Sequence, residues 1–197
     1  MTLRNAHLAD LPYLYEICHL TGYKGSDASS VVSDRTLLGQ YFAAPYVVRD
    51  PHWCWVVADD AGPAGYLVAT NDTRAFSRWM VEEWLPALRI LSPRKTDPSW
   101  SEFETWLRGL FHGAPSSPSF VDDYPAHLHI DLVPRTQGQG WGRQLIEAFV
   151  GQLRSEGVRG FHLGVGAENA GARRFYRKMG FSLLKEESWG EFLGLSL

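Results

Sequence analysis

The chain has 197 residues, of which 45% are hydrophobic and 13% aromatic, enough to bury the core of one sizeable domain. Its net charge of −3 argues against nucleic acid or an anionic membrane as the main partner. The chain starts with polar residues, no apolar run is long enough to span a bilayer, and Cys18 and Cys54 are too few for a disulfide framework or a zinc site, so we expect a cytoplasmic protein that uses no metal.

The first part of the chain predicts strands mixed with helices. In order, we expect a strand at residues 3–6, a helix capped by Asp10, a second helix near residues 34–42, and two strands at residues 53–58 and 65–69. The first helix carries apolar residues at helical spacing. The segment between the two strands is rich in Asp, Gly and Pro, so it favours a hairpin turn.

A long segment then precedes the next strand. About 55 residues separate Thr70 from Ala126, and they hold half of the chain's eight tryptophans. Apolar spacing predicts two helices within residues 73–112, separated by a proline-containing break. Such a segment is either a lid or substrate platform or a packed elaboration of the core.

The last part of the chain returns to alternating elements. A strand at residues 126–133 leads through a glycine-rich turn into a helix that ends near Gly157. Apolar residues recur on one face of that helix. Three further strands are expected at residues 161–165, 181–184 and 191–195.

The glycine-rich turn predicts a phosphate-binding site. Gly138, Gly140 and Gly142 alternate, so successive backbone N–H groups converge without interference from Cβ atoms. The helix that follows offers unpaired N–H groups at the positive end of its dipole. The turn lacks the Lys-Ser/Thr of a P-loop and the spacing of a dinucleotide-binding turn. A turn that binds no ligand is the plain alternative.

Two motifs carry a resemblance to a known family. The turn has the pattern Gln137-x-x-Gly140-x-Gly142, and residues 169–181 have the pattern Asn-x-x-Ala-x-x-x-Tyr-x-x-x-Gly-Phe. The second motif alone could be an amphipathic helix with Asn169 as its N-cap and Gly180 after its end. In this order and spacing, the two motifs resemble those of the GNAT superfamily of acyl-CoA-dependent N-acetyltransferases.

The resemblance implies an α/β (α+β) fold. We expect a single domain over residues 1–197, with a mostly antiparallel sheet of six or seven strands and helices on both faces. The strands at residues 126–133 and 161–165 would be the family's parallel pair, which splays apart. Residues 73–112 would form a helical insert before the fourth strand, on the acceptor side of the site.

The resemblance also implies acetyl-CoA as cosubstrate. Its pantetheine arm would contact the backbone of Leu132 and Val133 between the splayed strands, and the N–H groups of residues 138–143 would hold its pyrophosphate. The cofactor-binding residues implied are Leu132, Val133, Gln137, Gly138, Gln139, Gly140, Trp141, Gly142, Arg143, Asn169, Ala172 and Tyr176.

Catalytic candidates lie next to this site. The resemblance places Tyr176 beside the sulfur as general acid, although a core aromatic is the plain alternative. Strand alternation puts His129 and Asp131 on one face together with His127, so either of the first two could accept a proton. Each could equally be a buried polar residue satisfied by its neighbours. Asp122 and Asp123 could instead bind a cationic acceptor.

Two functions follow from these observations. The first is an N-acetyltransferase that moves acetyl to an amine on a small molecule or a protein lysine by direct attack on the thioester. The insert, residues 124–132 and the ending Gly-Leu-Ser-Leu also resemble the acetyltransferase-like C-terminal domain of protein O-GlcNAc hydrolases. That resemblance implies the second: a catalytically weak or inactive module that binds acetyl-CoA or a partner. Neither fixes an oligomeric state.

Overall fold

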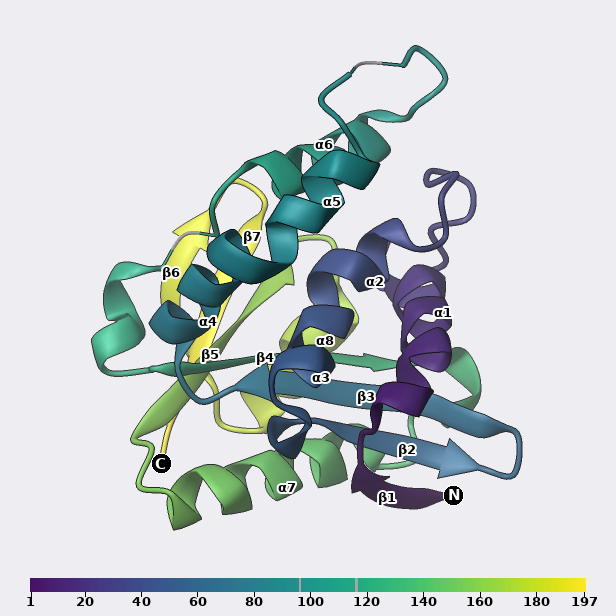
Figure 1. The fold of residues 1–197 in the computed structure, drawn as a ribbon. Helices are drawn as coiled ribbons and strands as arrows, with labels where there is room; N and C mark the ends of the chain where they lie inside the picture. The colour runs from purple at the N-terminus through teal and green to yellow at the C-terminus, as the bar shows by residue number, and fades with distance from the viewer. Residues whose placement is uncertain (96, 116) are drawn as a thin grey trace.

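A seven-stranded sheet forms the centre of the computed structural model, which describes residues 1–95, 97–115 and 117–197 (Figure 1). The strand order is β1-β2-β3-β4-β5-β7-β6, and every neighbouring pair is antiparallel except β4 and β5. The strands are β1 (Thr2–Asn5), β2 (Trp55–Asp59), β3 (Gly62–Thr70), β4 (Ala126–Leu132), β5 (Gly160–Gly166), β6 (Ser182–Glu187) and β7 (Gly190–Ser196). The mixed fold with one parallel pair is therefore as expected.

The N-terminal helices differ from the prediction in two respects. The helices are η1 (Leu8–Asp10), α1 (Leu11–Thr21), α2 (Leu37–Phe42), α3 (Ala44–Arg49) and η2 (Pro51–Trp53). Asp10 precedes α1 but makes no side-chain cap, because its carboxylate pairs with Arg4 at 2.7 Å and accepts the His7 N–H. The second difference is that α3 and η2 were not predicted, and η2 contains Trp53, which was expected to begin a strand. Pro45 lies in the first turn of α3, where a missing N–H costs nothing.

The segment between β3 and β4 is helical, as predicted. It contains α4 (Thr73–Trp79), η3 (Met80–Trp84), α5 (Leu85–Leu91), α6 (Glu102–His112) and η4 (Ser119–Asp122). The side chains of Asp72 and Ser101 cap α4 and α6 by accepting backbone N–H groups. Pro86 has no N–H to donate, and the wide π-turn of η3 lies directly before it.

The C-terminal helices follow the two motifs. The elements are η5 (Pro134–Thr136), α7 (Trp141–Ser155) and α8 (Ala170–Lys178). The face of α7 predicted to be apolar is buried at four positions, Leu145, Ile146, Phe149 and Leu153. Both helices are therefore held by amphipathic packing on the sheet.

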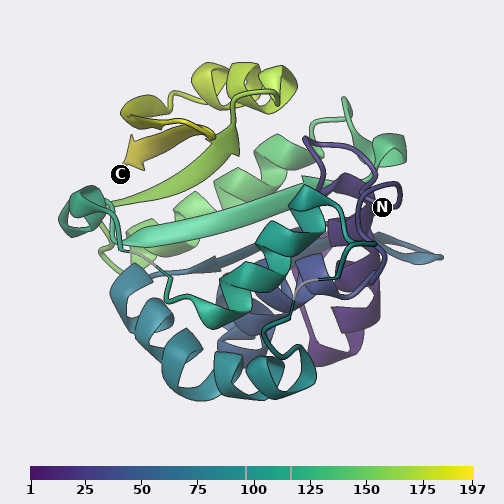
Figure 2. The ribbon, with the colours of Figure 1, turned by 90° about the horizontal axis from the view of Figure 1, so that it is seen from above.

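The sheet separates two cores. Tyr66 and Val68 on β3 pack with α1–α6, whereas Leu67 and Ala69, which alternate with them along the strand, pack with α7 and α8. Figures 1 and 2 show the two helical layers on opposite sides of the sheet. Cys18 and Cys54 are free thiols buried in the first core. Within the described ranges, no helix has the length and apolar character needed to cross a bilayer.

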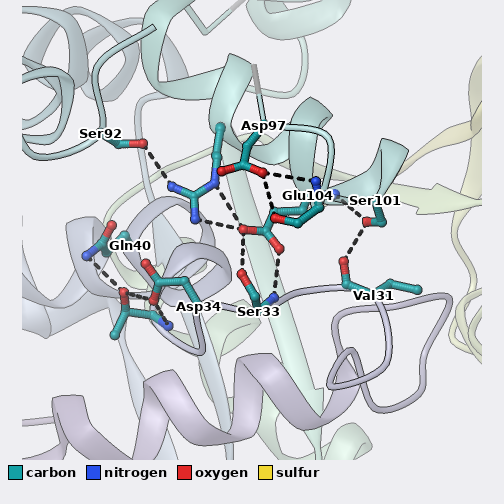
Figure 3. Close-up of polar contacts among 11 residues, drawn as sticks. Val31, Ser33, Asp34, Gln40, Ser92, Asp97, Ser101 and Glu104 are labelled. Carbon is teal, nitrogen blue, oxygen red and sulfur yellow. Dashed lines mark hydrogen bonds and ion pairs between the residues drawn. The ribbon is translucent and has the colours of Figure 1, made fainter. Parts of the chain in front are cut away.

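A buried carboxylate fastens α6 to the segment that follows α1 (Figure 3). Glu104 is 1% exposed. It accepts hydrogen bonds from the Ser33 N–H at 2.7 Å, the Ser33 hydroxyl at 2.9 Å and the Arg108 guanidinium at 2.7 Å. The Ser101 hydroxyl donates to the carbonyl of Val31. These contacts hold the end of the insert over the face of the sheet that carries the first core.

Candidate active site

The parallel strands β4 and β5 separate soon after they meet. They are paired only at Ala126 with Phe161 and at His127 with His162. In Figure 2 the teal-green β4 and the yellow-green β5 diverge beyond that point. A wedge-shaped opening in the sheet therefore begins after His127, and we call it the gap.

Backbone groups of β4 face the gap. The N–H of Val133 donates to the carbonyl of Ala64 at 3.1 Å, which makes these two residues a hydrogen-bonded pair. Because such pairs alternate along an antiparallel ladder, the N–H and C=O groups of Asp131 and His129 also point toward β3. Those of Ile130 and Leu132 point into the gap, where β5 no longer pairs with them. The N–H of Leu132 is thus available for the expected backbone contact, whereas its carbonyl accepts from the Gln137 side chain and the N–H of Val133 is already used.

The glycine-rich turn lies just beyond β4, at the start of α7. Gly138 and Gly140 have φ of 72° and 84°, a region that residues with a Cβ rarely adopt. A Cβ at either position would meet no atom within 4 Å, so the space beside them is open. Gly142 serves packing instead, because its Cβ would lie 3.2 Å from Cζ of Phe175. The turn leaves the first N–H groups of α7, from Trp141 to Arg143, without helical acceptors.

Other residues of the turn are engaged in shaping it. The side-chain amide of Gln137 donates to the carbonyl of Leu132 at 2.8 Å, and that of Gln139 donates to the carbonyl of Arg135 at 2.7 Å. Arg143 is exposed, and its guanidinium lies 3.6 Å from the carboxylate of Glu147. The two glutamines therefore position the backbone around the turn.

The second motif forms α8 on the α7 side of the sheet. Oδ1 of Asn169 accepts the N–H of Ala172 at 3.1 Å, which is the predicted N-cap. Tyr176 is 7% exposed and packs between Phe175 and Phe181. Its hydroxyl makes no hydrogen bond to any residue that the structure describes. Burial raises the pKa of Tyr176, and the negative charge of Asp131 raises it further, so the phenol stays protonated.

The opposite face of β4 presents the three residues predicted to share it. His127 is fully engaged: its Nε2 accepts from the Tyr46 hydroxyl at 2.8 Å, and its Nδ1 donates to the Thr73 hydroxyl at 2.7 Å. The Thr73 hydroxyl in turn donates to the carbonyl of Pro125, which fixes this assignment. Burial holds the pKa of His127 well below its usual range. It is a neutral residue that ties α3 and α4 to the sheet.

His129 and Asp131 are less constrained. The His129 ring packs edge-on against Phe42 and Tyr46, and burial lowers its pKa to about 4. Its ring nitrogens bond to no described residue. Asp131 is half-buried, and its Oδ2 accepts from the Tyr66 hydroxyl at 2.5 Å. Burial raises the pKa of this carboxyl, and no described cationic side chain pairs with it.

Three residues beside the site were not predicted from the sequence, namely Tyr66, Lys24 and Glu168. One predicted alternative, Asp122, is engaged in an ion pair. Tyr66 is fully buried on β3, opposite Asp131. Lys24, in the turn after α1, forms an ion pair at 2.5 Å with Glu168, which directly precedes the cap of α8. Strand alternation could have suggested Tyr66, whereas no local pattern indicates the Lys24 pair. Asp122 pairs with Arg74 and so is not a free anion.

The chain resembles known proteins in sequence and in fold. The sequence model of the Acetyltransferase (GNAT) family matches residues 26–181. A crystal structure described as SsHAT is 33% identical, with a TM-score of 0.89 over 99% of this chain and 97% of that one. Protein O-GlcNAcase of Rattus norvegicus is 22% identical over the whole chain, which spans only 22% of that relative's length. The PaiA N-acetyltransferase of Thermoplasma acidophilum in complex with coenzyme A shares the fold, at 13% identity and a TM-score of 0.59 over 100% of this chain and 98% of that one.

Proposed function

The chain belongs to the acetyltransferase (GNAT) family, and from this membership we propose that it transfers the acetyl group of acetyl-CoA to an amine. The observation that carries the proposal is the gap: β4 and β5 pair at two positions and then open toward the glycine-rich turn. An opening lined by backbone N–H and C=O groups suits a linear amide chain, and a helix N-terminus suits phosphate.

The residues present fit acetyl-CoA. The open space beside Gly138 and Gly140 is where added Cβ atoms would stand, and the free N–H groups at the start of α7 face the same turn. We place the pyrophosphate there, on residues 138–143. The backbone of Leu132 would hold the pantetheine arm, with Gln137 and Gln139 supporting the turn. Asn169 and Ala172 would position α8, which carries Tyr176.

Two side chains are placed to move protons. Acetyl-CoA supplies an acyl group activated as a thioester. The amine must lose a proton as it attacks, and Oδ1 of Asp131 is the carboxylate oxygen that Tyr66 leaves free. The departing sulfur must gain a proton, and Oη of Tyr176 has one that it shares with no described residue. A raised pKa makes Asp131 a stronger base than an ordinary aspartate.

His129 is the second candidate for proton removal. It is neutral, lies on the same face as Asp131, and could pass a proton to that carboxylate through a water molecule. A pKa of about 4 makes it the weaker base. His127 is excluded from this role because both of its ring nitrogens are engaged.

Acetyl-CoA binding and thiol release test the proposal separately. Calorimetry should detect acetyl-CoA binding, and a thiol reagent should detect coenzyme A released in the presence of primary amines. Binding without release by any amine would contradict transfer and favour the binding module. Absence of binding by a folded protein would overturn both functions.

A further inference from the structure

We call the face of the gap opposite α7 its floor, and its two strands contribute side chains of different size. On β4 it presents His127, His129 and Asp131, and on β5 the residues of the same face are His162, Gly164 and Gly166. The rings of His127 and His162 lie 5.6 Å apart where the strands are still paired. Continuing that register by two residues brings His129 alongside Gly164 across the gap. The β5 side of the floor therefore has no side chains beyond His162.

Two half-exposed tryptophans stand over this floor, one from each side. Trp106 on α6 is 51% exposed and stacks on Phe42, which packs against His129 with ring centroids 5.3 Å apart. Trp189, between β6 and β7, is 50% exposed and covers Gly164, where an added Cβ would lie 2.8 Å from the Trp189 ring. We call Trp106 and Trp189 the tryptophan pair.

Resting on the function proposed above, we propose that the tryptophan pair forms the entrance for the acceptor, and that the acceptor is a primary amine on a slender, unbranched alkyl arm. It arrives as its ammonium ion and gives one proton to solvent before the neutral nitrogen attacks, and the second proton then passes to Asp131 as proposed above. A lysine side chain and a linear alkyl polyamine both carry this group. The arm would pass between the two indoles, along the Trp189 ring that covers Gly164, and its nitrogen would reach Asp131. Trp106 and Trp189 are thus assigned as specificity-determining residues.

The charges along this path favour a cation. Asp131 has no cationic partner among the described residues, and aromatic faces attract alkylammonium groups. Burial lowers the pKa of all three nearby histidines, His127, His129 and His162, so none adds positive charge at neutral pH. Lys24, in the turn that follows α1, is paired with Glu168. The charge of Arg49 acts on His127, at the closed end of the gap, and its guanidinium packs over the rings of Phe76 and Trp79.

The shape of the path disfavours a bulky, polar amine. An amino sugar needs several directional hydrogen bonds, and unmet ones are costly once buried. The entrance instead offers the rings of Phe42, Phe103 and Trp106 on one side and those of Trp189 and Phe192 on the other. On β5, Gly164 lies beneath the Trp189 ring, and neither Gly164 nor Gly166 supplies a polar side chain.

Indole N–H signals test binding without relying on transfer. The probe is N-α-acetyl-lysine methylamide, added to 15N-labelled protein with saturating acetyl-CoA. The indole signals of Trp106 and Trp189, assigned from the Trp106→Phe and Trp189→Phe variants, should shift in a saturable manner. Those of the buried Trp53 and Trp55 should not shift. Unchanged Trp106 and Trp189 signals would overturn the inference, whatever the enzyme activity.

Acceptor kinetics provide the second test. Trp106→Leu and Trp189→Leu should each raise KM for the lysine probe by about fivefold, as expected for one lost cation–π contact, with an unchanged Kd for acetyl-CoA. Tyr13→Leu is the matched control, because the Tyr13 ring also lies over a glycine, Gly62, which starts β3 and belongs to neither side of the proposed entrance. If the two tryptophan variants had the same KM for the lysine probe as the Tyr13→Leu control, the assignment would be contradicted.

A panel of acceptors separates this inference from the function on which it rests. Cadaverine and the lysine probe distinguish a free polyamine from a peptide side chain, and glucosamine represents ring amines. Coenzyme A release that is faster with glucosamine would overturn the inference and leave transfer intact. Indole shifts without any coenzyme A release would support the inference and contradict the proposed transfer.

Discussion

The buried hydroxyl of Tyr66 donates a 2.5 Å hydrogen bond to Oδ2 of Asp131. The two residues are directly opposite each other on β3 and β4 and project from the same face of the sheet. This contact fixes one carboxylate oxygen, and burial raises the pKa of the group. The second oxygen is the one that we propose as the proton acceptor.

Replacing the carboxylate should have opposite effects on activity and stability. Asp131→Asn keeps an acceptor for Tyr66 but cannot take a proton, so we expect transfer to fall by about 10²-fold or more. In the folded protein the pKa of Asp131 lies above its unfolded value of about 3.9. Ionisation of Asp131 therefore lowers the stability of the folded state as pH rises through the folded pKa. The variant should therefore melt at a higher temperature than the wild type at about pH 8, with the difference vanishing near pH 3.

Thermal unfolding at both pH values and coenzyme A release provide the measurements for Asp131→Asn. Asp60→Asn, at an exposed position in the turn between β2 and β3, is the control and should change neither property. Full activity in Asp131→Asn would remove Asp131 from the mechanism.

Tyr176→Phe should separate chemistry from binding. The hydroxyl has no described hydrogen-bond partner, so its loss should leave folding and acetyl-CoA affinity nearly unchanged. If Tyr176 protonates the departing sulfur, transfer should fall by about 10²- to 10⁴-fold. Calorimetry and coenzyme A release measure the two effects, with Tyr13→Phe as an exposed control. Wild-type turnover would reduce Tyr176 to a packing residue.

Two glycines of one segment should respond differently to substitution. Gly140→Val places a side chain in the open space of the turn and forces a φ of 84°, so acetyl-CoA affinity should fall by about tenfold or more. Gly151→Ala, within α7 and with no neighbour near its added Cβ, should leave affinity unchanged and stabilise the helix by about 1 kcal/mol. Equal calorimetric affinity in a folded Gly140→Val protein would place the pyrophosphate elsewhere.

Glu104→Ala should lower the free energy of unfolding much more than Glu102→Ala. Glu104→Ala leaves Arg108 and the Ser33 N–H without their partner at a buried position, and we expect a loss of about 3 kcal/mol in the free energy of unfolding. Glu102→Ala removes an exposed carboxylate from the first turn of the same helix and should cost at most about 1 kcal/mol. Urea unfolding would decide, and equal losses would contradict the anchoring of α6.

Local features of the site followed directly from the order of residues. Alternating glycines predicted the turn at residues 138–142, Asn169 was correctly placed as the cap of α8, and alternation put His127, His129 and Asp131 on one face. Each of these depends on backbone geometry over a few residues, because strands repeat every two residues and caps act within one turn. For the same reason the helical insert and its break could be located, and the family motifs could be matched.

Tertiary structure decided which groups meet. It assigned Asp10 to Arg4 rather than to the end of α1, engaged the N–H of Val133 with Ala64, and brought Tyr66 to Asp131. It also joined Ser33 to Glu104, which is 71 residues away in the sequence. Hydrogen bonds and ion pairs form wherever folding brings donors and acceptors within about 3 Å, and packing of the two cores fixes those positions. The sequence spacing of such partners has no period, so no local pattern reveals them.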